Sequence, residues 1–252
     1  MSDWSVFQGD KIVLRSTSIT TWLRCPKKFF FSYILNAETQ GSISTRAGSL
    51  VQEMLSDYAL SKNMDAVLVK YWSKIKDLPE SGRITKDHIL MLAAKYTDRY
   101  SEMPQRVEQK FEFEYAPDVV IRGAFDGLIE HNGLVYVFER KTGSKSNSYD
   151  TEHFYRMKMQ YPRSFQLRLY DYVAQKMFGE RYKGVVLELI FFEPGKVEID
   201  RIDIMPQHVE QDIKFVLDSC LEDIRRLDFM KNWTACHEWG RPCEFLNRCE
   251  VL

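Results

Sequence analysis

A β-hairpin is predicted by one segment of this chain, Ile121-Arg-Gly-Ala-Phe-Asp126-Gly-Leu-Ile-Glu-His-Asn132-Gly133-Leu-Val-Tyr-Val-Phe-Glu139-Arg140-Lys141. Two runs rich in Val, Ile, Phe and Tyr flank its Asn-Gly pair, and Asn-Gly between such runs favours a two-residue turn. With that turn, His131 pairs with Leu134. Each further pair joins the preceding residue of the first strand to the following residue of the second strand. Asp126 is therefore expected directly opposite Glu139.

Two carboxylates in these positions repel each other, because directly opposite residues of an antiparallel pair have Cβ atoms about 4.5–5.5 Å apart. A divalent cation offsets the repulsion, and carboxylate oxygens are the ligands that Mg²⁺ prefers. Lys141 lies two residues beyond Glu139 and therefore shares its face of the strand. The pattern predicts either a metal site with a lysine beside it or a surface hairpin in which Lys141 only neutralises the two acids.

The rest of the sequence divides into a helical first part and a β-rich middle part. Apolar residues at helical spacing predict helices over residues 19–35, interrupted at Pro26, and over 46–60, 64–75 and 86–101. Runs rich in β-branched and aromatic residues predict strands over 110–115, 119–130, 134–141, 184–192 and 197–205. A helix over 161–178 is expected to cross over between two of these strands, and another helix covers 207–229.

These elements predict an α/β fold in a single domain over residues 1–252. Residues 1–105 form its mainly helical N-terminal part, 106–205 its sheet and crossover helix, and 206–252 its last helix and a cysteine-rich segment. No apolar run approaches the about 18–20 residues that cross a bilayer, and the polar residues 1–10 show no secretory signal. A cytoplasmic protein without a membrane partner is expected.

The charges of the chain nearly cancel, with 35 Lys and Arg against 36 Asp and Glu. Many nucleic-acid-binding domains are strongly basic, so the total alone argues against such a partner. The local counts differ: residues 11–34 contain five basic residues and no acidic one, 140–183 contain ten basic and four acidic, and 196–230 contain five basic and nine acidic. Basic segments with tyrosines among them, such as Tyr149, Tyr155 and Tyr161, suit the binding of a single strand.

The five cysteines are Cys25, Cys220, Cys236, Cys243 and Cys249. An odd number in a chain without a secretory signal argues against a disulfide scaffold. The last three follow the spacing C-x6-C-x5-C, and with Cys25 they provide four thiolates that could hold either Zn²⁺ or an iron–sulfur cluster. Cys220 lies in a helical pattern and is expected to be a small buried hydrophobic residue.

The hairpin resembles the PD-(D/E)XK nuclease superfamily, in which an Asp on one strand and an E-x-K on the next bind a metal ion and activate water. The resemblance implies Mg²⁺ or Mn²⁺ held by Asp126, Glu139 and the backbone carbonyl of Arg140, with Lys141 positioning or polarising the attacking water. It also implies a restriction-endonuclease-like core, which is a mixed β-sheet flanked by helices. Phosphodiester hydrolysis of this kind needs no covalent intermediate, because the cation lowers the pKa of bound water and the lysine stabilises developing negative charge.

Two further motifs are similar to the RecB-like branch of this superfamily. Gln166-Leu-Arg-Leu-Tyr170 matches its Q-x-x-x-Y motif, and residues four apart share a helix face, so the resemblance implies that Gln166 and Tyr170 both point at the site. The segment from Gly48 to Glu53 resembles the G-x-x-x-H helix, whose histidine is usually a metal ligand. Gln52 stands at that position, and its amide oxygen is a weaker ligand than imidazole. Glu53 could compensate, although it points about 100° away around a helix.

One early cysteine with three near the C-terminus resembles the cluster-bearing RecB-like nucleases, namely the AddB-type helicase–nuclease subunits and the CRISPR-associated exonuclease family numbered four. The resemblance implies a [4Fe–4S] cluster, with structural Zn²⁺ as the alternative, held by Cys25, Cys236, Cys243 and Cys249. The usual spacing is C-x2-C-x5-C. The first gap here is longer, Gly240 stands at a cysteine position of the family, and His237 is an alternative ligand to Cys236.

Together the motifs predict a metal-dependent DNA nuclease, an exonuclease that acts on single-stranded ends. Similar proteins serve DNA recombination and repair, phage DNA processing or CRISPR adaptation, which implies partners from those pathways in a bacterial, archaeal or phage-infected cell. The alternative, motivated by Gln52, is a catalytically weak DNA-binding or assembly module that keeps the nuclease fold and the cluster.

Overall fold

The computed structural model describes residues 5–37, 43–79, 83–99, 103–144, 153–240 and 242–251. The chain forms two compact units. One consists of Met1–Gln40, Lys110–Gly123 and His208–Leu252 and is called here the terminal unit; the other consists of Gly41–Gln109 and Ala124–Gln207 and is called the central unit. None of the helices in the described ranges combines the length and the hydropathy that a membrane-spanning segment needs.

Seven strands of the described residues form one mixed sheet, which confirms the predicted fold class. They pair in the order β1-β2-β4-β5-β6-β7, and β3 pairs with β4 off this path. The neighbours β2 and β4, and also β5 and β6, are parallel. The strands are β1 (Phe7–Gln8), β2 (Lys11–Leu14), β3 (Arg106–Ala116), β4 (Val119–His131), β5 (Leu134–Ser144), β6 (Tyr182–Glu193) and β7 (Lys196–Ile204).

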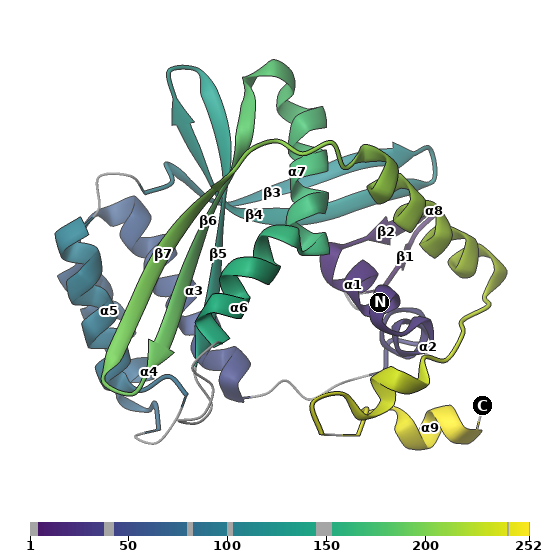
Figure 1. Cartoon of the computed structure of the whole chain (residues 1–252), viewed down its shortest axis with the longest axis horizontal. Coiled ribbons are helices and arrows are strands. Elements are labelled where there is room, and N and C mark those ends of the chain that lie inside the picture. Colours follow the sequence, from purple (N-terminus) through teal and green to yellow (C-terminus); the bar gives the residue numbers. More distant parts are fainter. Residues whose placement is uncertain are drawn as a thin grey trace. The chain divides into compact units, whose positions relative to one another are not determined.

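The crossover between the parallel strands β5 and β6 is helical, as predicted, but it contains two helices in place of one (Figure 1). They are α6 (His153–Gln160) and α7 (Phe165–Phe178), separated by a 3₁₀ turn over Tyr161–Arg163. The prediction of a helix from residue 161 is wrong because Pro162 lies in the 3₁₀ turn and Ser164 caps α7. The Ser164 side chain accepts a hydrogen bond from the N–H of Leu167 and so starts a new helix there.

Three helices of the central unit, α3 (Ile43–Ser61), α4 (Met64–Lys76) and α5 (Lys86–Arg99), contribute most of an apolar core. Their bounds agree with the predicted helices to within a few residues, because each has an apolar stripe at helical spacing. Asn63 caps α4 by accepting a hydrogen bond from the N–H of Ala66 at 3.0 Å. The helices pack against Ile190, Phe192 and Val197 of β6 and β7, which gives these two strands a covered face.

The terminal unit holds α1 (Ser16–Arg24), α2 (Pro26–Phe29), a π-helical turn (Phe30–Ile34), α8 (Glu210–Arg226), a 3₁₀ helix (Trp233–Gly240) and α9 (Leu246–Val251). The interruption predicted at Pro26 is confirmed: Cys25 has an extended backbone between α1 and α2, and its N–H bonds to the carbonyl of Thr21. Strands β1 and β2 were not predicted, because two to four residues are too few to show a period of two.

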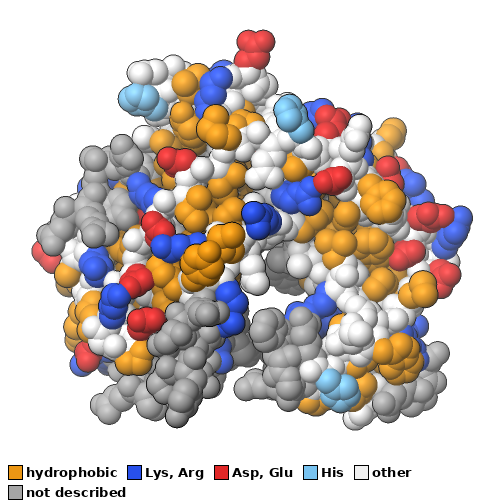
Figure 2. Space-filling view, in the orientation of Figure 1, with side chains coloured by type: hydrophobic (Ala, Val, Ile, Leu, Met, Phe, Trp, Pro, Cys, Tyr) orange, Lys and Arg blue, Asp and Glu red, His pale blue; other side chains and the backbone are white. Residues whose placement is uncertain are grey.

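Apolar side chains remain exposed among charged ones on the surface, as Figure 2 shows for one face of the molecule. Among the exposed large hydrophobic residues of the described ranges are Tyr155, Met205, Phe215, Met230 and Trp233. Scattered exposure of this kind is normal, so exposure alone does not indicate a function for any of these residues.

Gly184, near the start of β6, is a position where the end of the neighbouring strand β7 admits only glycine. Its φ is +133°, and a Cβ there would lie 2.1 Å from the carbonyl oxygen of Ile204. We expect Gly184→Ala to lower the free energy of unfolding by about 2–3 kcal/mol, because backbone strain and a backbone clash act together. Urea unfolding measures the change. Gly195→Ala is the matched control, since Gly195 has a φ of +71° but open space around it; equal losses for both variants would contradict the contact with Ile204.

Candidate active site

The hairpin of β4 and β5 has the predicted register. Asn132 and Gly133 both have positive φ angles, +50° and +78°, as a two-residue turn of this type requires. The paired residues run from His131 opposite Leu134 to Gly127 opposite Phe138. Asp126 and Glu139 occupy the next position along the two strands. The β4–β5 ladder of paired residues ends just before them, whereas Glu139 is paired with Leu187 of β6 on the other side of β5.

Glu139 is buried, with 1% of its surface exposed. Its Oε1 accepts hydrogen bonds from Lys141 Nζ at 2.6 Å and from Gln166 Nε2 at 2.9 Å. Its Oε2 is also buried, and it has no hydrogen-bond partner among the described residues. A buried carboxylate oxygen without a hydrogen-bond partner is destabilising, so a ligand that contacts Oε2 would remove this cost.

Asp126 is half-buried, and its Oδ2 accepts a hydrogen bond from the backbone N–H of Arg140 at 2.8 Å. The N–H and C=O of one residue point toward the same neighbouring strand in an antiparallel pair. The carbonyl of Arg140 therefore points to the β4 side, where Asp126 lies. The expectation that this carbonyl contributes an oxygen to the site stays a prediction.

The charges of the site are strongly coupled. Burial, and secondarily the nearby Asp126, raise the pKa of Glu139 to about 7, although Lys141 acts against this. Burial disfavours the ammonium of Lys141, but Glu139 and Asp126 outweigh that effect and raise its pKa. Lys141 is thus held as a cation next to two acids, with 21% of its side chain exposed. The second predicted alternative, a solvent-exposed surface hairpin, disagrees with the burial of Glu139.

The donors at this place fit a hard divalent cation. Asp126 and Glu139 offer carboxylate oxygens, which Mg²⁺ and Mn²⁺ prefer. Oε2 of Glu139 is buried and has no partner among the described residues, and Asp126 is close enough to act on the charge of Glu139. Within the described ranges no group of three or more His, Cys, Asp or Glu side chains could hold a metal ion. A cation bound by this pair would therefore need further oxygens from the backbone, from water or from a substrate.

Helix α7 brings its two predicted residues to the site. Gln166 contacts Glu139 directly, as described above, so it is not merely a solvent-facing residue. Tyr170 is buried with 5% exposed and packs edge-on against Phe125, with ring centroids 5.3 Å apart. Tyr170 also lies close enough to Lys141 to act on its pKa. Both residues face the same side of the sheet as the proposed metal ligands.

Helix α3 meets β5 just beyond Lys141. A Cβ on Gly48 would lie 3.2 Å from Oγ1 of Thr142, so the absence of a side chain at Gly48 allows the helix to approach the strand. Gln52 is half-buried one helical turn further on. Glu53 forms an exposed ion pair with Lys74 of α4 at 2.7 Å. The role of Gln52 stays a prediction.

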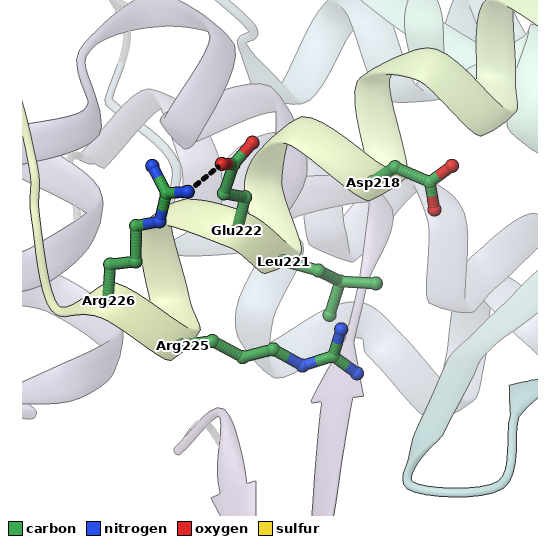
Figure 3. A pocket seen from close by; sticks show the side chains of 5 residues that line it. All are labelled: Asp218, Leu221, Glu222, Arg225 and Arg226. Atoms are coloured by element: carbon green, nitrogen blue, oxygen red, sulfur yellow. Dashed lines mark ion pairs between the residues drawn. The ribbon is translucent and has the colours of Figure 1, made fainter.

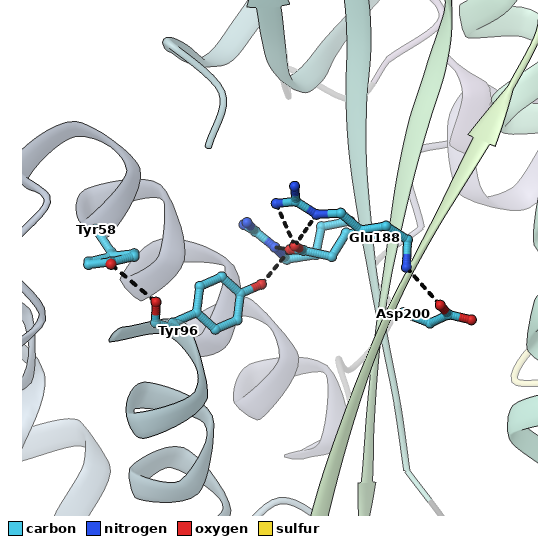
Figure 4. Close-up of polar contacts among 6 residues, drawn as sticks. Tyr58, Tyr96, Glu188 and Asp200 are labelled. Atoms are coloured by element: carbon cyan, nitrogen blue, oxygen red, sulfur yellow. Dashed lines mark hydrogen bonds and ion pairs between the residues drawn. The ribbon is translucent and has the colours of Figure 1, made fainter. Parts of the chain in front are cut away.

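A buried charge network behind Glu139 and Lys141 was not predicted from the sequence. The side chain of Arg140 points to the opposite face of β5, where its Nε donates to Glu188 Oε2 at 2.6 Å. Arg201 Nε and Nη2 both donate to Glu188 Oε1 at 3.1 Å, and the hydroxyl of Tyr96 also donates to Glu188 (Figure 4). Glu188 is fully buried. A single acid in the otherwise apolar run of residues 185–192 was the available signal.

The charges around Glu188 favour its ionised form. Burial would raise the pKa of this carboxyl, but Arg140 and Arg201 outweigh burial and lower it. Both guanidinium groups also lie over the ring of Phe138, at 5.0 and 5.8 Å from its centroid. The network thereby ties β5, β6, β7 and α5 together at the level of the E-x-K residues.

The four predicted cluster ligands all lie in the terminal unit. Cys25 is buried, whereas Cys236, Cys243 and Cys249 are half-buried, and none of the four is in a disulfide. The N–H of Cys243 donates to the carbonyl of Cys236 at 2.7 Å, and Cys249 lies within electrostatic reach of Cys25 and Cys236. They gather at one place, but as arranged they do not form a metal-holding group. Cys220 is fully buried in α8, as predicted.

A pocket of about 310 Å³ lies along α8 in the terminal unit (Figure 3). It is lined by Asp218, Leu221, Glu222, Arg225 and Arg226. Its charges are already paired: Arg226 with Glu222 at 2.6 Å, Arg225 with Asp118 at 2.8 Å, and Asp218 with the hydroxyl of Tyr115 at 2.7 Å. The pocket contains none of the predicted site residues, and its paired charges leave little reason for an ionic ligand to bind there.

Comparisons with known proteins place the chain in a wider context. The sequence model of the PD-(D/E)XK nuclease superfamily matches residues 16–250. No curated protein matches the chain. Among solved structures, a protein from Eubacterium rectale described as a putative exonuclease has a TM-score of 0.53 at 10% identity, over 95% of this chain and 94% of that chain. The crystal structure of SSO0001 covers 93% of this chain and 84% of its own, at 16% identity and a TM-score of 0.36. At such identities the first likeness concerns the fold alone.

Proposed function

Because the chain belongs to the PD-(D/E)XK nuclease superfamily, we propose that it is a deoxyribonuclease that uses Mg²⁺ or Mn²⁺ to hydrolyse phosphodiester bonds at single-stranded ends. The observation that supports this most directly is the buried Glu139, whose Oε2 has no partner among the described residues and which lies beside Asp126 and Lys141. Such an arrangement is costly for stability, which is typical of a binding site.

The residues of the site have different roles in the proposed reaction. Asp126, Glu139 and the Arg140 carbonyl would hold the cation, which when bound polarises the scissile phosphate and lowers the pKa of bound water. The hydrogen bond from the Arg140 N–H holds Asp126 in place. Gln166 fixes the orientation of Glu139. Lys141, kept charged by the neighbouring acids, would stabilise negative charge that develops on the phosphate.

A cleavage assay tests this function. Single- and double-stranded DNA of the same sequence, labelled at one end, is incubated with the protein and Mg²⁺, Mn²⁺ or EDTA. We expect metal-dependent shortening of the single strand, abolished by EDTA and by Glu139→Gln. Absence of cleavage under all conditions would exclude the enzyme.

The alternative is a catalytically weak DNA-binding or assembly module, and Gln52 in the place of the family histidine favours it. Retained DNA binding with no cleavage in the same assay would support this alternative. Gln52→His then provides a further measurement, since imidazole is a stronger ligand than an amide. A gain of cleavage in this variant would identify Gln52 as the cause.

The proposal includes a [4Fe–4S] cluster held by Cys25, Cys236, Cys243 and Cys249, with Zn²⁺ as the alternative. Its support is the family-like order of the cysteines and their gathering in the terminal unit. We expect a brown protein with about four iron atoms per chain, and we expect Cys249→Ser to lose both the colour and thermal stability, because ligand binding contributes folding energy. Cys220→Ser, at a cysteine outside the set, should keep its iron. A colourless protein with stoichiometric zinc would contradict the cluster.

A further inference from the structure

Helix α6 packs against the sheet through the face that carries Phe154 and Met157. Phe154 stacks on Phe191 of β6, with ring centroids 5.1 Å apart, and Met157 is buried with 5% exposed. Met157 covers Gly143 so closely that a Cβ on this glycine would lie 2.2 Å from its sulfur. Lys158 adds an ion pair to Asp200 of β7 at 2.6 Å. These contacts hold α6 against β5, β6 and β7 of the central unit.

The anchor places α6 directly beyond the proposed site. Gly143 follows Lys141 by two residues on β5, which is a distance of about 6.6–6.8 Å along a strand. Residues 139, 141 and 143 share one face of the strand, because side chains alternate. The contact between Met157 and Gly143 thus sets α6 on the face that carries Glu139 and Lys141 (Figure 1).

The outer side of α6 combines an aromatic ring with positive charge. Tyr155 is 65% exposed and Met159 is 42% exposed, and these residues lie four apart on one helix face. Arg156 and Arg163 are also exposed. Residues 153–170 contain four basic residues and no Asp or Glu, although the whole chain has a net charge of −1. This local excess complements a phosphate backbone.

We infer that the exposed face of α6 is the platform on which the substrate strand lies, with Tyr155 stacking on an unpaired base next to the bond that is cut. The inference rests on the proposed nuclease function. It gives a structural reason why the enzyme would prefer single strands to duplexes. An aromatic side chain can stack on the face of an unpaired base, whereas the bases of an intact duplex already stack on one another. A duplex would interact with this face only through the attraction between its phosphates and the positive charges.

The inference is tested by DNA binding in a Glu139→Gln background, which prevents cleavage during the measurement. Fluorescence anisotropy with a labelled oligothymidine and with a duplex of equal length compares Tyr155→Ala, Tyr155→Phe and Phe215→Ala. Phe215, exposed on α8, serves as the matched aromatic control. We expect Tyr155→Ala to weaken single-strand binding by about 5- to 100-fold, with duplex binding unchanged. Tyr155→Phe keeps the ring and should bind like the parent, as should Phe215→Ala.

Each other outcome overturns the inference in a recognisable way. Unchanged single-strand binding by Tyr155→Ala excludes stacking, and an equal loss for single strand and duplex assigns the face to backbone contact alone. If Tyr155→Ala changes the oligomeric state in analytical ultracentrifugation and leaves DNA binding unchanged, the face is a protein interface. These results leave the nuclease function intact when the wild-type protein still cleaves DNA. A wild-type protein that neither binds nor cleaves DNA removes both proposals.

Discussion

Lys141→Ala is expected to lower the rate of DNA cleavage by about 100- to 1,000-fold. The magnitude is that of removing one preorganised group that stabilises negative charge in a transition state. Lys141 is well placed for this role, because its Nζ lies 2.6 Å from Glu139 Oε1 and the neighbouring acids keep it charged. Single-turnover cleavage of labelled single-stranded DNA measures the rate, and anisotropy measures binding of the intact strand, which should change far less.

The control for this variant is Lys196→Ala. Lys196 is exposed at the turn between β6 and β7, where it pairs with Glu198, and its loss should leave cleavage unchanged. Thermal unfolding verifies that Lys141→Ala remains folded, since this variant also leaves Glu139 with one hydrogen bond fewer. A Lys141→Ala protein that is folded and cleaves at the wild-type rate would exclude the proposed role and favour the view that Lys141 only neutralises the acids.

Glu188→Gln is expected to lower the free energy of unfolding by about 3–5 kcal/mol. Removing one partner of a buried ion pair leaves the other charge without compensation in a low-dielectric surrounding. Glu188 is fully buried and accepts from both Arg140 and Arg201, so its neutralisation removes the carboxylate charge that these two guanidinium groups share. Glutamine has nearly the same size and shape, which separates the loss of charge from a loss of packing. Urea unfolding followed by circular dichroism gives the free energy.

The matched control is Glu198→Gln on the neighbouring strand. Glu198 forms an exposed ion pair with Lys196, and exposed pairs contribute only about 0–1 kcal/mol. If Glu188→Gln costs no more than Glu198→Gln, the network does not stabilise the sheet. A second comparison replaces all three charges, as Arg140→Met, Glu188→Leu and Arg201→Met: replacing a whole buried ion-pair network by apolar residues is often close to neutral, so this variant should be more stable than Glu188→Gln alone.

Local sequence was sufficient for the hairpin and for most helices. The register of β4 and β5 follows from Asn132-Gly133, because a two-residue turn leaves only one pairing, and counting residue pairs back from the turn reaches Asp126 and Glu139 without further information. The helices α3, α4 and α5 follow from their apolar stripes. The crossover between β5 and β6 was recognised, but its division at Ser164 was not, since a single capping serine is a weak signal in a long helical pattern.

Other features depend on contacts between residues far apart in the chain. Glu188 lies 48 residues from Arg140, and Tyr96 is 92 residues from Glu188, so their meeting is set by sheet order and helix packing. The same applies to the ion pair between Glu53 and Lys74, which lie on different helices. The predicted contribution of Tyr149 to strand binding lies outside the described residues.

By itself the sequence determined the identities and the order of the chemistry-bearing groups: an acid on each arm of a tight hairpin, a lysine two residues on, Gln166 and Tyr170 one helical turn apart, and four cysteines toward the chain ends. These follow from periods of two and 3.6 residues, which are properties of the local backbone. Only the tertiary structure decided that the buried Glu139 has one oxygen without a partner among the described residues, that the Arg140 side chain bonds to Glu188, and that α6 packs on Gly143, two residues beyond Lys141. Burial and ion pairing depend on which surfaces meet, and no local pattern specifies that meeting.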